Sequence, residues 1–266
     1  MRIAAALGLA ALTLAVSAPG AQANDAVQLQ YDFRAGEVLK YRLNMKSSAT
    51  FRMPDGQVQK LNMTNYLELS QELIEKTGDG DYRIAVSIDK ANQTVNGKNQ
   101  RLPVPEGQVN IITLGPNGQV KQLTGSAPAQ SSQNLQMVFP TRALRKGDNW
   151  EQVQSLQHPL PISTTTVYQV EDLKANFPGY KGDVVFVSSE MALENSETAT
   201  KEVVKSKTKG NLWFDSQRGR IVRSSARSDF SFELPITIPD LVPEGSNVKV
   251  ELELKVDIAL IDVEKK

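Results

Sequence analysis

Cationic side chains are concentrated between Lys201 and Arg227, and this stretch is the part of the sequence best suited to bind an anion. It holds eight Lys and Arg residues but only two acidic residues, Glu202 and Asp215. One interpretation is a solvated sheet face, or a sheet edge that lysines protect from pairing. The other is a surface for anionic lipid headgroups or cell-wall polymers. The candidate binding residues are Lys201, Lys205, Lys207, Lys209, Arg220 and Arg223.

Three large aromatic residues are also candidates for binding: Phe139, Trp150 and Trp213. Rings of this size bury a large area in any β-fold, so filling a core where strands begin is one role for them. Stacking on a sugar, or capping a cavity that holds an acyl chain, is the alternative.

Catalytic and metal-binding patterns are scarce. The one histidine, His158, precedes a proline and has no acidic neighbours, and no Gly-x-Ser-x-Gly segment presents a nucleophile. With one His and no Cys, a zinc site would have to rely on carboxylates, and Asp79-Gly80-Asp81 is too short for a calcium loop. We therefore expect no enzymatic activity, no metal and no cofactor. A carboxylate pair for glycoside hydrolysis stays an open alternative, because the required distance between the two carboxyl groups is set by the folded structure and not by their separation in sequence.

Long alternating segments must position these residues. From Leu39 to Met53 the odd positions are mostly apolar and the even positions polar, and the same period of two recurs from Leu61 to Leu73 and from Val248 to Leu260. A period of two predicts strands with one buried and one wet face. Fifteen residues would extend roughly 50 Å, so such strands must twist and curl. Helices, a second sheet or a ligand must cover the apolar face.

Turn residues divide the rest of the chain into shorter strands. The Pro54-Asp55-Gly56 segment predicts an antiparallel hairpin. Only Ala129 to Phe139, which Pro140 ends, has helical spacing. Further strands are predicted at Tyr82 to Ile88, Val109 to Leu114, Ile162 to Val170, Val184 to Leu193, Thr198 to Thr208, Asn211 to Phe214, Ile221 to Arg227 and Phe230 to Ile238.

The two halves of the chain have similar turn motifs. Gly36-Glu37 before Tyr41 resembles Gly147-Asp148 before Trp150, and two further pairs of turns follow in the same order. We infer an internal duplication with β-units at 27–125 and 136–262, joined by a linker at 126–145 that holds the short helix. The predicted fold is all-β, with long curved antiparallel sheets in a half-barrel or sandwich-like arrangement.

The first residues predict export. Arg2 precedes an apolar run from Ile3 to Val16, and Ala21-Gln22-Ala23 is a site for signal peptidase. The run is shorter than the ~20 residues of a membrane-spanning helix. We therefore expect a signal peptide at 1–23 and a soluble mature chain in the periplasm or outside the cell. The 30 basic and 30 acidic residues disfavour nucleic acid as a partner.

Several motifs resemble those of a family of uncharacterised secreted bacterial β-proteins. They are Tyr31-Asp32-Phe33, Phe139-Pro140, the run from Lys146 to Trp150, the run from Gly210 to Asp215, and Gly219-Arg220. The resemblance implies a fold and no activity. The long curled strands also resemble, in architecture only, the periplasmic carriers of outer-membrane lipoproteins, which hold acyl chains in an apolar concavity.

Two functions follow as expectations. The first is a non-enzymatic exported binding module whose apolar concave sheet takes a lipid-like or other hydrophobic ligand. The second is a cell-envelope interaction or scaffold protein, which would hold a protein or polymer through a sheet edge or the basic 201–227 surface.

Overall fold

The computed structural model describes residues 25–100, 106–124, 137–156, 162–195, 205–235 and 247–266. Every regular element in these ranges is a β-strand, so the prediction of an all-β fold is confirmed. The strands are β1 (Glu37–Arg52), β2 (Val58–Lys76), β3 (Tyr82–Val95), β4 (Lys98–Gln100), β5 (Val109–Leu114), β6 (Val120–Thr124), β7 (Asn149–Leu156), β8 (Ile162–Ala175), β9 (Val184–Asn195), β10 (Lys205–Asp215), β11 (Arg220–Pro235) and β12 (Asn247–Lys265).

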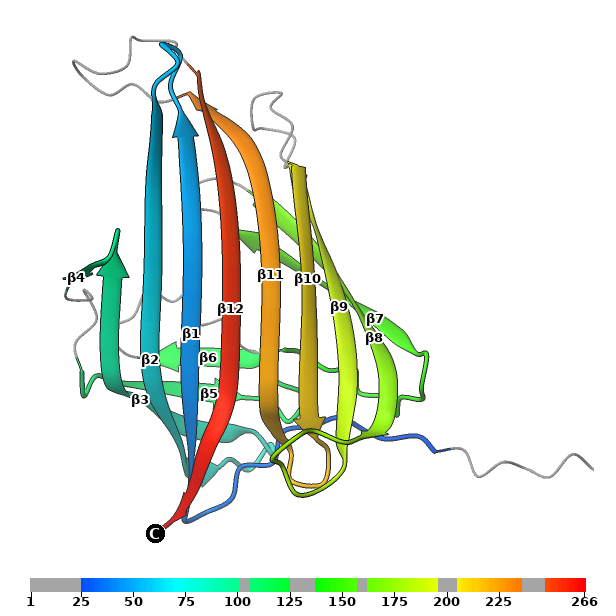
Figure 1. Ribbon diagram of the computed structural model, residues 1–266. Helices are drawn as coiled ribbons and strands as arrows, with labels where there is room; N and C mark the ends of the chain where they lie inside the picture. Colours follow the sequence, from blue (N-terminus) through cyan, green and yellow to red (C-terminus); the bar gives the residue numbers. More distant parts are fainter. Residues whose placement is uncertain (1–24, 101–105, 125–136, 157–161, 196–204, 236–246) are drawn as a thin grey trace, which may run out of the picture.

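All strands belong to one antiparallel sheet, in the order β6-β5-β3-β2-β1-β12-β11-β10-β9-β8-β7, with β4 paired to β3. The chain starts at the centre in β1, moves outward to β6, continues at the opposite edge in β7 and returns to the centre in β12 (Figure 1). Among the described strands, β6 and β7 each pair on one side only, so the sheet is open. The long curved antiparallel strands are thus confirmed, and they form one curved sheet instead of two packed sheets.

The predicted turns join these strands. Gly56 has a φ of 86° in the β1–β2 hairpin, which pairs Arg52 with Val58 as the Pro54-Asp55-Gly56 segment predicts. The β10 strand is continuous where the sequence suggested two strands, and β11 likewise spans two predicted runs. The predicted helix lies mostly outside the described residues, and its described end at Met137 to Phe139 is not helical. Both predicted β-units contribute a meander to the one sheet, and their duplication stays a prediction.

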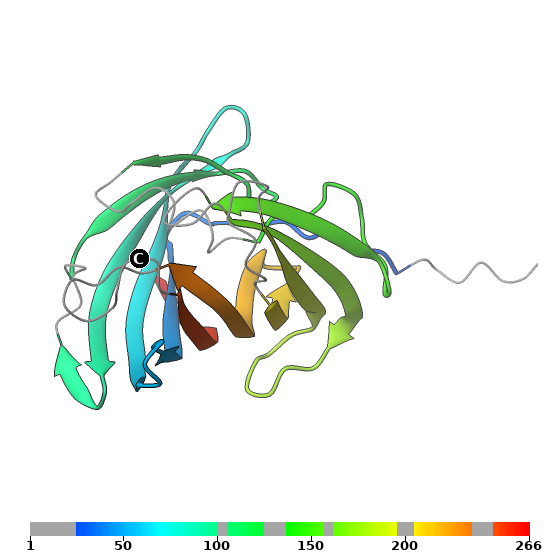
Figure 2. The ribbon, with the colours of Figure 1, turned by 90° about the horizontal axis from the view of Figure 1, so that it is seen from above.

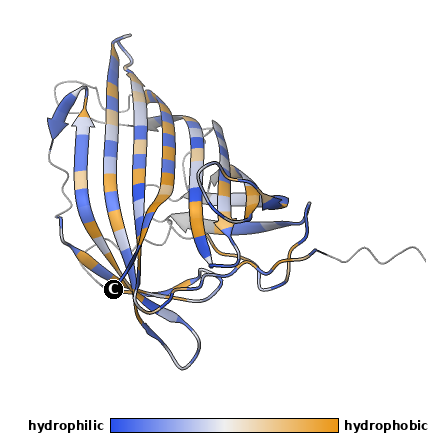
Figure 3. Cartoon of the chain, turned by 60° about the horizontal axis from the view of Figure 1, so that its bottom comes forward, coloured by the Kyte–Doolittle hydropathy of each residue, from blue (hydrophilic) through white to orange (hydrophobic). Residues whose placement is uncertain are grey.

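The sheet curls strongly when seen along its strands (Figure 2). Register shifts interrupt the pairing in five strand pairs, among them between Lys40 and Tyr41 and between Trp213 and Phe214. Such bulges bend a strand and increase its twist. Polar and apolar bands alternate along the strands (Figure 3), because successive side chains point to opposite faces.

Side chains from strands all around the sheet meet in one buried cluster, so the face that they share is the concave one, here called the inner face. The cluster includes Tyr41 of β1, Ile84 of β3, Leu114 of β5, Val187 of β9 and Leu212 of β10. It lies at the lower end of the sheet, where β1 begins and β12 ends (Figure 1). The opposite face of the sheet is called the outer face.

An extended N-terminal segment, residues 25–36, closes the lower end. Val27 bridges Leu144, the N–H of Tyr31 donates to the carbonyl of Pro116 at 2.7 Å, and the N–H of Asp32 donates to Gly219 at 3.0 Å. The segment therefore ties the β5–β6 turn, the chain before β7 and the β10–β11 turn together. Leu29, Tyr31 and Phe33 complete the buried cluster.

Candidate functional site

The upper half of the inner face is apolar but separate from the buried cluster. Cross-strand neighbours there include Ala49 with Leu252 and Leu61, Ser47 with Leu254 and Met63, and Phe51 with Val250. Leu61, Met63, Leu252 and Leu254 are half-buried, and none of them belongs to the cluster that the N-terminal segment completes. We call this surface the upper zone.

A few polar groups interrupt the inner face. Asn65 is 8% exposed and accepts a hydrogen bond from Gln93 at 3.0 Å. Asn110 Oδ1 and Thr208 Oγ1 are buried and have no hydrogen-bond partner among the described residues. Thr208 faces Ser228 on β11, which in turn faces Leu254. A buried polar atom without a partner costs free energy.

The outer face carries a line of cations across four adjacent strands. Lys46 of β1 faces Lys255 of β12, Lys255 faces Arg227 of β11, and Arg227 faces Lys209 of β10. We call these four residues the basic row. All four are exposed to solvent.

Acidic neighbours partly balance the basic row. Glu253 forms ion pairs with Arg227 at 2.9 Å and with Lys255 at 3.0 Å, and Glu190 forms an ion pair with Lys209 at 3.0 Å. The hydrogen bond from Lys255 and the charge of Arg227 lower the pKa of Glu253. The hydrogen bond from Lys209 likewise lowers the pKa of Glu190. Among the described residues, Lys46 has no acidic partner.

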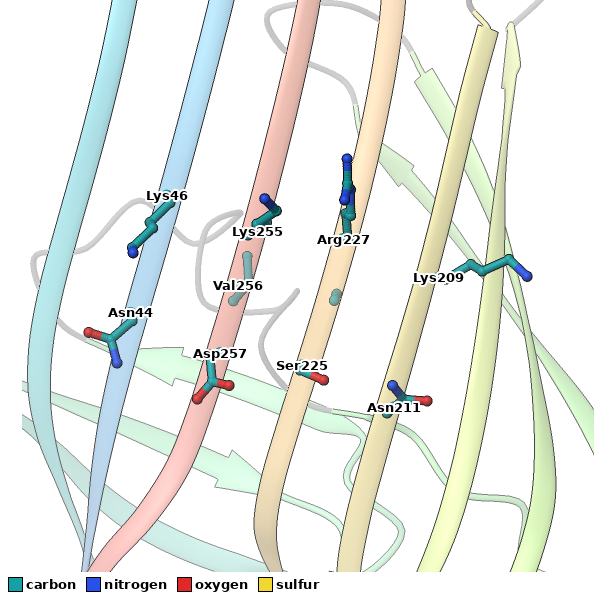
Figure 4. A pocket seen from close by; sticks show the side chains of 10 residues that line it. Asn44, Lys46, Lys209, Asn211, Ser225, Arg227, Lys255, Val256 and Asp257 are labelled. Atoms are coloured by element: carbon teal, nitrogen blue, oxygen red, sulfur yellow. The ribbon is translucent and has the colours of Figure 1, made fainter. Parts of the chain in front are cut away.

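A polar row runs beside the basic row, and the two rows line a hollow on the outer face of about 440 Å³. The polar row consists of Asn44, Asp257, Ser225 and Asn211, each facing the next across the strands. In Figure 4 these side chains lie across the strands beside the cations, while Val256 points to the opposite side. The hollow is thus distinct from the apolar upper zone.

The basic candidates separate onto different parts of the molecule. Lys207 and Lys209 are exposed on the outer face, and Arg223 forms an ion pair there with Asp257 at 2.5 Å. Arg220 is 3% exposed and pairs with Glu37 at 2.8 Å, so it is no part of an exposed basic surface. Lys205 begins β10, but its side chain is outside the described part, as are Lys201 and His158.

The aromatic candidates also lie apart. Phe139 is 1% exposed and contacts Tyr31, Phe214 and Trp150 in the buried cluster. Trp150 stacks on Tyr168 at 5.0 Å, and its indole N–H donates to the Val138 carbonyl. Trp213 is on the outer face, where it pairs with Phe186 at 5.1 Å and Phe177 at 5.3 Å.

Arg227 ends the basic stretch 201–227 but was not a predicted site residue, and Lys46 and Lys255 lie outside that stretch. Their polar positions in alternating strands placed them on the solvated face. Their meeting with Arg227 and Lys209 depends on the β1–β12 and β11–β12 pairings, which join distant parts of the chain.

The described side chains form no group of three or more His, Asp or Glu residues able to hold a metal ion. Within the same ranges, no helix is long and apolar enough to cross a membrane. Asp79-Gly80-Asp81 forms the turn between β2 and β3.

Two solved structures have a distant likeness to this chain. No family model and no curated protein matches the chain. A structure of lipovitellin, which describes its lipid–protein interactions, aligns with 88% of this chain at 14% identity and a TM-score of 0.49, and the chain covers 26% of that protein. DynF of the dynemicin pathway of Micromonospora chersina aligns over 88% of this chain and 85% of its own, at 6% identity and a TM-score of 0.22. Neither likeness carries an argument about function, and the resemblance to secreted bacterial β-proteins stays a prediction.

Proposed function

We propose that this chain is a non-enzymatic, exported binding protein that holds a lipid-like or other hydrophobic ligand against the upper zone of its inner face. The observation that carries the proposal is the half-buried upper zone, which lies above a lower end already closed by its own core. The leader pattern at 1–23 supports export to the periplasm.

Contact between water and this half-buried apolar face costs free energy. Burying apolar surface gains about 25 cal/mol per Å², or roughly 0.8 kcal/mol for each methylene group. An acyl chain on Leu61, Met63, Leu252 and Leu254 would bury its own surface and theirs together.

The test is a titration with the fluorescent apolar probe 1-N-phenylnaphthylamine. The Leu61→Gln/Met63→Gln variant places two amides on the inner face of β2 and should weaken binding about tenfold, equal to ~1.4 kcal/mol. The Lys60→Gln/Thr64→Gln variant changes the flanking outer-face positions of the same strand and should bind as the parent does. Equal binding by both variants, with both folded by circular dichroism, would show that the upper zone is not the site.

A further inference from the structure

Contact with solvent alone does not explain the line of like charges in the basic row. Like charges directly opposite each other on neighbouring strands are destabilising. Here three successive cross-strand pairs, Lys46–Lys255, Lys255–Arg227 and Arg227–Lys209, bring cations together. With strands ~4.8 Å apart, the row is roughly 14 Å long.

The hollow keeps a positive balance after its ion pairs are counted. Its lining includes all four cations of the basic row and one carboxylate, Asp257. Arg223, from outside that lining, holds Asp257 through two hydrogen bonds at 2.5 and 3.0 Å. Glu253 forms ion pairs with both Arg227 and Lys255, Asp229 lies 3.6 Å from Arg227, and Glu190 pairs with Lys209 at 3.0 Å. Lys46 has no acidic partner in the described part of the chain. An anion in the hollow therefore meets cations that are incompletely neutralised.

The acidic residues beside the row restrict the shape of that anion. Glu253 and Asp229 face each other on one side of the row, and Asp257 lies on the other. A flat anionic membrane would meet these carboxylates together with the cations. A narrow chain that lies along the row, with charges recurring at about the ~4.8 Å strand spacing, would meet mainly the cations.

The polar row indicates that the anion also carries hydroxyl groups. The side chains of Asn44, Ser225 and Asn211 make no hydrogen bonds with described residues, so their donors and acceptors face the hollow or solvent. An amide offers both a donor and an acceptor, as a sugar hydroxyl does, whereas a phosphate chain offers acceptors only. Trp213 and Phe186 lie in the next row of the outer face, beyond Asn211, and supply an apolar surface for a sugar ring.

We propose that the hollow formed by the basic row and the polar row binds a linear anionic polysaccharide, whose carboxylates contact the cations and whose hydroxyls contact the amides. This site is independent of the proposed hydrophobic-ligand site, because the two lie on opposite faces of the sheet.

The experiment is isothermal titration of the folded protein with an oligogalacturonate at pH 7 and low salt, with its methyl-esterified form as the neutral probe. The parent should bind the first and not the second, and added salt should weaken binding by screening the exposed charges. Lys46→Gln/Arg227→Gln should weaken binding about tenfold, which corresponds to ~1.4 kcal/mol. Lys98→Gln/Lys146→Gln removes the same charge from exposed positions outside the row and should bind as the parent does.

Other outcomes would overturn the proposal. If both charge variants bind alike, the row is not the site. If polyphosphate binds as tightly as the oligogalacturonate, the hollow binds polyanions in general and does not recognise a polysaccharide. If phosphatidylglycerol vesicles bind and the oligogalacturonate does not, the surface recognises a membrane. The Leu61→Gln/Met63→Gln variant should bind the oligogalacturonate normally, which separates this test from that of the hydrophobic ligand.

Discussion

At the scale of single residues, a buried carboxylate organises the turn between β10 and β11. Asp215 is 1% exposed and accepts hydrogen bonds from the Tyr180 hydroxyl at 2.6 Å, the Arg218 guanidinium at 2.8 Å and the backbone N–H groups of Gln217 and Arg218. Burial alone would raise the pKa of Asp215, but the hydrogen bonds from Tyr180 and Arg218 outweigh it and lower the pKa. The ionised form is therefore the stabilising one.

Replacing this carboxylate should change both stability and its pH dependence. Because the folded pKa of Asp215 is lowered, its contribution is present above the unfolded pKa of about 4 and is lost as pH falls through the folded pKa. Asp215→Asn should lower the unfolding free energy at pH 7 by about 3 kcal/mol. Its stability should also fall less than that of the parent as the medium is acidified.

Urea unfolding from neutral to acidic pH measures both effects. Asp79→Asn, at an exposed position in the β2–β3 turn, should follow the parent at every pH. An Asp215→Asn variant with the full acid dependence of the parent would contradict the assignment.

At the scale of elements, the N-terminal segment depends on two glycines for its close approach to the turns. Gly118 has a φ of 92°, and a Cβ there would overlap the Met137 carbonyl oxygen and the Tyr31 ring. A Cβ at Gly219, with a φ of 60°, would overlap the backbone of Asp32. The closed lower end therefore requires both a left-handed backbone and the absence of a side chain at these turns.

Alanine at these turns should loosen the lower end. Gly118→Ala combines about 1–2 kcal/mol of backbone strain with an overlap that costs a further ~1–3 kcal/mol. Gly56→Ala is the matched control, since Gly56 has a φ of 86° and no atom within 4 Å of a built Cβ, so it should show the strain alone. Thermal unfolding of the two variants checks the difference. Equal destabilisation would mean that the N-terminal segment is not packed on this turn.

The sequence predicts the strands far better than it predicts which strands pair with each other in the sheet. Alternation and turn residues place β1, β2, β5 and β12 and the hairpin between β1 and β2, because those signals are local. The pairing of β1 with β12 joins the two ends of the chain, and no local pattern specifies it. Arg220 and Arg223 lie in the same strand with a register shift between them, and no local pattern shows that Arg220 is buried against Glu37 while Arg223 pairs with Asp257. Only the pairing shows that Lys46 and Lys255 join Arg227 and Lys209.

At the scale of the whole molecule, one curved sheet presents two different surfaces. Its lower end is closed by the N-terminal segment, its upper inner face is apolar and half-buried, and its outer face carries the basic row. Burial of apolar surface is the largest favourable contribution to both folding and association. A hydrophobic ligand bound to the upper zone would therefore stabilise the folded protein.

Native mass spectrometry of the protein purified without detergent, followed by solvent extraction, tests the central claim most directly. We predict a lipid-like adduct in stoichiometric amount, which the Leu61→Gln/Met63→Gln variant loses and the Lys60→Gln/Thr64→Gln variant keeps. A bare protein mass, in a preparation that also leaves 1-N-phenylnaphthylamine unbound, would contradict it and would show that the upper zone is a closed part of the core.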